Sequence, residues 1–80
     1  LGVMPDYSYD EKGLKVDSVV SNRPAKKAGV QDGDVVLKIA NTDIVDIYKY
    51  MEALSGIEPG EKTKIIILRD EKEIELDVQF

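Results

Sequence analysis

The sequence predicts a small α+β domain that is mostly β, with five to six strands, one short helix and one longer helix. Residues 14–20 and 73–80 alternate apolar and polar side chains, which is the period of a half-buried strand. Residues 65–68 form a continuous apolar run, Ile-Ile-Ile-Leu, which is typical of a strand covered on both faces. Residues 47–54 place apolar side chains at helical spacing, which favours the longer helix. A chain of 80 residues holds one such unit, so we expect residues 1–80 to be a single domain.

The segment between the first two strands is predicted to be a polar loop. Residues 6–13 are turn-like, and Tyr7 and Tyr9 are its candidate contacts for a ligand. Its acidic side chains suggest a calcium site at first sight: Asp6, Asp10 and Glu11. Their spacing is not that of a calcium-binding loop, so we expect solvated carboxylates there and no metal.

The short helix and the following strand are predicted by residues 21–39. Pro24 suits the first helical position, and Ser21 or Asn22 is placed to cap the helix. Gly29 suits the left-handed position that ends a helix. Asp32-Gly33 is typical of a tight turn, and an apolar strand is expected over residues 35–39.

The longer helix has a capping residue and a stop. Residues 41–43 are expected to turn, and the side chain of Asp46 suits the N-cap position before residue 47. Ser55-Gly56 ends the helix. Ile47, Met51 and Leu54 fall on one stripe, with Tyr50 and Ala53 beside it; the simplest interpretation is one broad core-facing surface.

The end of the chain predicts a β-hairpin. Pro59-Gly60 is a turn, residues 62–69 form a strand, and residues 70–72 turn the chain into the alternating strand 73–80. The polar face of that last strand is acidic, which is typical of a solvated sheet surface and discourages pairing at the sheet edge.

Composition excludes several function classes. The chain has 11 Lys and Arg against 16 Asp and Glu, a formal net charge of −5, which argues against a nucleic-acid partner. It has no Cys and no His, so thiol chemistry, the commonest general base and the commonest metal ligand are missing, and we expect no cofactor. No apolar run approaches the length of a membrane span, and no signal peptide is present. The chain starts at Leu1, so we expect a domain excised from a larger protein.

One run of residues resembles the PDZ domain family. Its pattern is P-A-x-x-A-G-apolar-x-x-G-D followed by an apolar strand, and it is carried by Pro24-Ala25, Ala28-Gly29-Val30 and Gly33-Asp34. The resemblance covers essentially the whole chain. It implies a small, partly open β-barrel or sandwich and a non-catalytic module that binds peptides.

The bacterial, protease-associated form of the domain is the nearest in pattern. The Pro59-Gly60 turn, the strand that ends in Arg69 and the last alternating strand resemble domains attached to HtrA-type serine proteases, carboxy-terminal processing proteases and secreted zinc aminopeptidases. Residues 1–7 and 44–54 are most similar to the aminopeptidase-attached form. The resemblance implies a periplasmic or extracellular parent protein.

The resemblance also implies where a peptide would bind. Four residues correspond to the loop that holds a peptide's terminal carboxylate: Leu1, Gly2, Val3 and Met4. Pro5 departs from the family because it has no N–H to donate to a bound peptide, so either its nitrogen faces away from the ligand or the groove is shorter than usual. On the longer helix, the resemblance assigns three residues to the peptide groove and leaves Tyr50 and Ala53 to the core: Ile47, Met51 and Leu54.

Two functions follow from these observations. The first is a module that binds C-terminal or extended peptides by strand addition and regulates or positions substrate for an attached peptidase. Ile47, where a histidine would favour Ser or Thr, favours an apolar side chain two residues before the peptide's end. The second is a structural domain that docks on its parent protease and has no peptide ligand of its own. Catalysis by the domain itself is not expected, because no nucleophile–base pair, phosphate loop or zinc motif is present.

Overall fold

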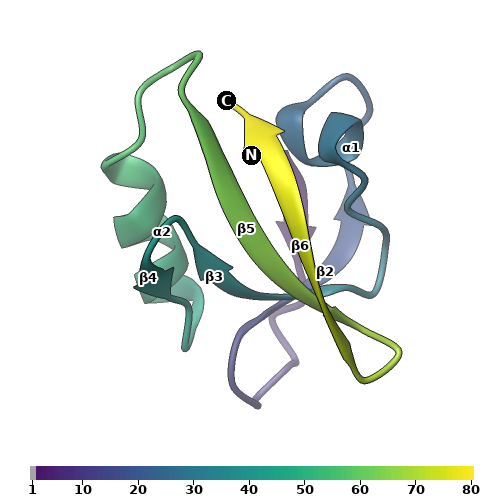
Figure 1. Cartoon of the computed structure of the whole chain (residues 1–80). Coiled ribbons are helices and arrows are strands. Elements are labelled where there is room, and N and C mark those ends of the chain that lie inside the picture. Colours follow the sequence, from purple (N-terminus) through teal and green to yellow (C-terminus); the bar gives the residue numbers. More distant parts are fainter. Residues whose placement is uncertain (1) are drawn as a thin grey trace.

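The computed structural model describes residues 2–80 and confirms a mostly β, α+β domain (Figure 1). It has six strands and two helices, in the predicted order. Their bounds are β1 Val3–Pro5, β2 Leu14–Val19, α1 Pro24–Ala28, β3 Val35–Ile39, β4 Thr42–Asp43, α2 Ile47–Ser55, β5 Lys62–Arg69 and β6 Lys72–Gln79.

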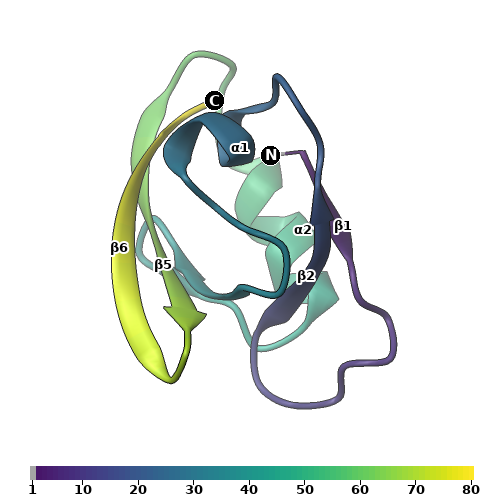
Figure 2. The ribbon, with the colours of Figure 1, turned by 90° about the vertical axis from the view of Figure 1, so that its right-hand side faces the viewer.

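The strands form one curled antiparallel sheet in the order β1-β2-β3-β5-β6, with β4 paired to β3 (Figures 1 and 2). The predicted hairpin of β5 and β6 is confirmed over its full length, from Lys62 opposite Gln79 to Arg69 opposite Lys72. β4 differs from the expected turn because residues 42–43 pair back onto β3. The order leaves β1 at one end of the sheet, bonded only to β2.

The core lies inside the curl of the sheet. Its fully buried aliphatic side chains are Val16, Val30, Val36, Ile39, Ile44, Ile65, Ile67 and Val78. Within the apolar run of β5, Ile65 and Ile67 are inaccessible to solvent, whereas Ile66 and Leu68 are only half-buried. The expectation of a strand covered on both faces was therefore wrong, because neither helix within residues 2–80 lies over the outer face of the β5–β6 hairpin (Figure 2).

The ends of the helices follow local chemistry with two exceptions. The side chain of Asp46 caps α2 by accepting a hydrogen bond of 2.9 Å from the backbone N–H of Lys49. Gly29 ends α1 at φ 103°. The prediction of Ser21 or Asn22 as the cap of α1 was wrong: the N-cap is Arg23, whose side chain makes no capping hydrogen bond.

The second exception is Gly56 at the end of α2, which has φ −90° and is therefore not left-handed.

The position of the α1 cap at Arg23 has a local cause. Asn22 takes a left-handed φ of 63°, which a helix start does not use, so the turn carries the chain one residue further before α1 begins.

Candidate peptide-binding groove

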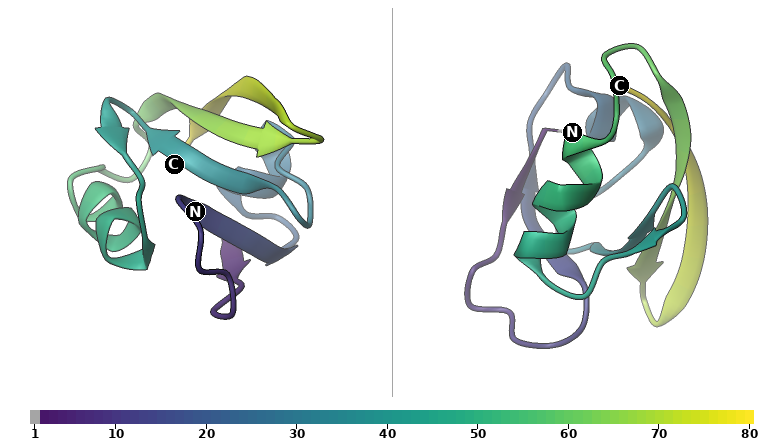
Figure 3. Two further views of the ribbon diagram at one scale, coloured as in Figure 1. Left: turned by 90° about the horizontal axis from the view of Figure 1, so that it is seen from below. Right: turned by 90° about the vertical axis from the view of Figure 1, so that its left-hand side faces the viewer.

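The candidate groove lies between the open edge of β1 and the helix α2. Val3 lies opposite Val19 and Met4 opposite Ser18, so β2 covers only one edge of β1. α2 runs alongside the other edge in the opposite direction, and the start of β1 lies near the C-terminal end of α2 (Figures 2 and 3). An extended peptide could therefore pair with β1 while its side chains meet α2.

Backbone hydrogen bonds show which residues of β1 face the open edge. The carbonyl of Gly2 accepts from the N–H of Val20 at 2.8 Å, and the N–H of Asp6 donates to the carbonyl of Lys15 at 2.9 Å. Both residues thus direct these groups toward β2. Since an antiparallel strand alternates the direction of its backbone groups, Val3 and Pro5 present theirs to the open edge.

This geometry decides between the two alternatives for Pro5. Its nitrogen lies on the open edge, so the edge offers the N–H and carbonyl of Val3 but only the carbonyl of Pro5. The register shift between Met4 and Pro5 leaves this assignment intact, because Asp6 again points to β2. The open edge therefore offers one hydrogen-bond donor fewer than a strand without proline.

Gly2 has a conformation that other residues rarely adopt. Its φ is +89°, and a Cβ added to it would lie 2.1 Å from the Cβ of Arg23 and 2.5 Å from its Cγ. Glycine is thus required at this position for two reasons: the positive φ, and the side chain of Arg23, which occupies the space that a Cβ would need. Val3 is half-buried against the core and Met4 is 53% exposed, whereas Leu1 lies outside the described residues.

The predicted residues of α2 differ in burial. Tyr50 is 7% exposed and belongs to the core, which raises its pKa to about 12 by burial, whereas Met51 is 61% exposed. Ile47 and Leu54 are half-buried and pack against the edge of the core, as does Ala53. One broad core-facing surface is therefore wrong for Met51, whereas Ile47, Ala53 and Leu54 are alike in packing against the core.

The loop after β1 adds a cavity at the far end of the groove. It measures about 200 Å³, and its lining includes Pro5, Tyr7, Tyr9, Lys15, Val45 and Ile47. The N–H of Gly13 donates to the carbonyl of Val45 at 3.3 Å, which joins this loop to the start of α2. Sequence analysis identified Tyr7 and Tyr9 as candidate contacts but did not place them beside Ile47.

The acidic residues of that loop are engaged locally. The hydroxyl and the N–H of Ser8 donate to Oδ1 of Asp6, at 2.6 and 3.0 Å, and these bonds lower the pKa of Asp6. Within residues 2–80, no group of three acidic side chains is close enough to hold a metal ion. In the same part of the chain, neither helix is long and apolar enough to cross a bilayer.

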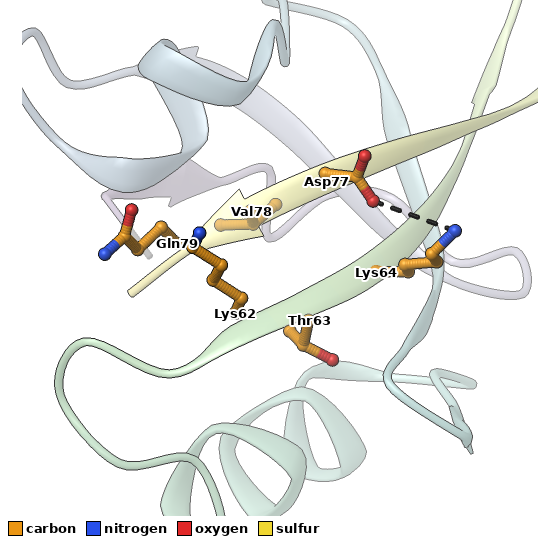
Figure 4. Close-up of a pocket in the computed structure, with 6 residues that line it drawn as sticks. All are labelled: Lys62, Thr63, Lys64, Asp77, Val78 and Gln79. Atoms are coloured by element: carbon orange, nitrogen blue, oxygen red, sulfur yellow. Dashed lines mark ion pairs between the residues drawn. The ribbon is translucent and has the colours of Figure 1, made fainter.

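A second hollow lies far from the groove, on the β5–β6 hairpin (Figure 4). It is lined by Lys62, Thr63, Lys64, Asp77, Val78 and Gln79. The ammonium of Lys64 lies 3.2 Å from Oε1 of Glu75 and 3.9 Å from Oδ1 of Asp77, and the bond to Glu75 raises the pKa of Lys64. These exposed ion pairs have the character of a solvated sheet surface.

A family model for the PDZ domain matches residues 1–80. The chain belongs to the PDZ domain family. This confirms the family predicted from residues 24–34, and it makes the chain a peptide-binding module with no catalytic role of its own.

The relatives of this PDZ domain are HtrA-type proteases. It is 35% identical over 78 residues to the serine endoprotease DegS of Haemophilus influenzae, covering 96% of this chain and 23% of the relative. It is 38% identical over 66 residues to a probable periplasmic DegP-like serine endoprotease of Pseudomonas putida, covering 82% of this chain and 14% of the relative. The chain thus spans less than a quarter of these relatives.

Solved structures share the fold. A variant of the HtrA-type protease AlgW with a decapeptide superimposes with a TM-score of 0.88 at 26% identity, over 99% of this chain and 27% of that one. The HtrA3 PDZ domain bound to the phage-derived ligand FGRWV gives a TM-score of 0.78 at 22% identity, over 99% of this chain and 81% of that one. An aminopeptidase N family protein of Idiomarina loihiensis gives a TM-score of 0.77 at 24% identity, over 94% of this chain and 13% of that one.

Proposed function

We propose that this PDZ domain binds the C-terminal ends of peptides, which add to β1 as an antiparallel strand and lie against α2. The observation that carries the proposal is the open edge of β1, with the left-handed Gly2 at its head and the exposed Met51 beside it. Glycine lets successive backbone N–H groups converge on an anion, so the amides of Leu1, Gly2 and Val3 would hold the terminal carboxylate.

The side chains of α2 give the expected preference for sequence. Ile47 lies at the start of the helix, where an apolar neighbour favours an apolar peptide side chain two residues before the end. Met51 and Leu54 lie further along the helix, toward the start of β1, and would contact the last side chain of the peptide. An unbranched thioether such as that of Met51 adapts to ligands of different shape.

The similarity to HtrA-type proteases supports a role beside a peptidase. We propose that the domain regulates an attached bacterial peptidase or positions its substrate, and that the parent protein is periplasmic, as the DegP-like relative is described. Of the three parent classes that the sequence resembles, the identity to DegS favours the HtrA type over the aminopeptidase type.

The test uses four synthetic pentapeptides, FGIWV and its variants ending in Ile, Leu and Phe, so that the residue two before the end is apolar in each, and every peptide is made as free acid and as C-terminal amide. Titration followed by calorimetry should give binding of at least one free acid and much weaker binding of its amide. Equal affinity for both forms, or no binding of any of them, would overturn recognition of the carboxylate.

A docking role without a peptide ligand is the second candidate, and Pro5 is the observation that favours it. An edge that lacks one donor is a poorer template for strand addition. In that case the groove of the complete parent protein would be covered by its own catalytic domain. Protection of Met51 from oxidation in the parent, but not in the 80-residue domain, would support docking.

A further inference from the structure

We infer that Arg23 provides the positive charge that faces the terminal carboxylate of a bound peptide. This inference rests on the proposed function and adds a specificity-determining residue to it. None of the residues assigned to the groove from sequence carries a charge, and Arg23 lies outside the strand and helix that form the groove.

The position of Arg23 brings its side chain across the carboxylate loop. Val20 pairs with Gly2, and the chain then turns through Asn22 so that Arg23 returns over the same glycine. The Cβ and Cγ of Arg23 both lie within 2.5 Å of the point where a Gly2 side chain would begin. The guanidinium is two bonds beyond Cγ, so its charge stays within reach of a carboxylate held at the amides beside Gly2.

Arg23 has no structural task that would explain a cation at this place. It occupies the N-cap of α1 without a capping hydrogen bond from its side chain, where Ser, Thr, Asp or Asn would stabilise the helix. It is exposed, and none of the ion pairs formed among residues 2–80 includes it. Its guanidinium is therefore free to bind an anion.

Charge makes this cation important for a ligand that ends in a carboxylate. The chain carries a net charge of −5, so its overall field repels an anionic peptide end. A guanidinium beside the loop offsets that repulsion locally, and its planar donors match a carboxylate in geometry. Backbone amides and Arg23 would then approach the same carboxylate from two sides.

The experiment compares Arg23→Gln, Arg23→Lys and the control Lys26→Gln. Lys26 is another exposed cation of the same segment, so its substitution changes the net charge equally, but the atoms nearest to an added Gly2 Cβ belong to Arg23 and not to Lys26. Each variant is titrated with the tightest-binding pentapeptide of the four, as free acid and as amide. Arg23→Gln should weaken the free acid about three- to tenfold and leave the amide unchanged, the range of an exposed to partly desolvated charge pair.

Arg23→Lys should recover part of the lost affinity for the free acid, and Lys26→Gln should reduce that affinity less than twofold. Raising the salt concentration should weaken binding of the free acid in the wild-type domain, but in Arg23→Gln it should not, because only the repulsion from the negative domain is left to be screened. An equal loss for acid and amide in Arg23→Gln, an equal loss in Lys26→Gln, or no loss at all would overturn the role of Arg23. These results differ from failure of the proposed function, in which the wild-type domain itself does not distinguish acid from amide.

Discussion

Arg69 holds the buried carboxylate of Asp34 at both of its oxygens. Nε of Arg69 lies 2.9 Å from Oδ1 and Nη2 lies 2.7 Å from Oδ2, while Nη2 also donates to the carbonyl of Gly29 at 2.9 Å. Asp34 is 2% exposed, and it accepts a further bond from the N–H of Gln31. One bidentate pair therefore joins the end of β5, the end of α1 and the turn before β3.

This pair predicts a difference between two cations of the same strand. Arg69→Met leaves the carboxylate of Asp34 buried without its partner, so the urea concentration at the unfolding midpoint should fall clearly. Lys64→Met, the matched control, removes an exposed pair with Glu75 and should leave the midpoint unchanged. Asp34→Asn should cost about 2 kcal/mol of unfolding free energy, because it removes charge-assisted hydrogen bonds. Equal midpoints for the Arg69 and Lys64 variants would contradict this account.

Gly2 should be required for binding as well as for backbone conformation. Gly2→Ala forces a side chain onto Arg23 at φ +89°, and Gly60→Ala is its control, because Gly60 has φ +83° with nothing within 4 Å of an added Cβ. Both variants should lose about 1 kcal/mol of stability from backbone strain, and Gly2→Ala should lose more because its added Cβ also clashes with Arg23. Only Gly2→Ala should also lose most of its affinity for a free-acid pentapeptide. Unchanged affinity in Gly2→Ala would remove this loop from the site.

Restoring a donor at Pro5 should improve strand addition. Pro5 lies two residues after Val3 on the open edge, opposite the third residue from the end of an added peptide. Pro5→Ala supplies an N–H there, so affinity for a pentapeptide should rise about two- to fivefold, the net value of one hydrogen bond. Pro59→Ala, in a turn remote from the groove, controls for loss of a proline. A dipeptide, too short to reach Pro5, should bind both variants as it binds the wild type.

Most elements could be predicted from the sequence because their causes are local. The alternation of residues 14–20 and 73–80, the N-cap of Asp46 and the left-handed Gly29 each depend on neighbours within a few residues. The PDZ pattern of residues 24–34 made it possible to predict how these elements assemble into a fold, and the family match confirms that prediction.

What could not be predicted depends on pairs of segments. The orientation of the Pro5 nitrogen follows from the register of β1 on β2, and a shift by one residue would reverse it. The exposure of Ile66 follows from the absence of a helix over the outer face of β5 and β6. The contact of Arg23 with Gly2 joins residues far apart in sequence, and no sequence signal indicated it, because the cap of α1 was expected at residues 21–22.

Tyr50 should make the domain less stable at high pH. Its burial raises the pKa of the phenol from the ordinary 10.0 to about 12, so between these pH values the unfolded chain loses a proton that the folded chain keeps. Stability is therefore complete below pH 10 and should fall by about 2 kcal/mol as the pH rises to 12. Lysines also titrate in this range, so the measurement is the difference between wild type and Tyr50→Phe in urea unfolding at pH 8, 10 and 11.5. Parallel stability curves for the two proteins would show that Tyr50 ionises as freely in the folded domain as in the unfolded chain.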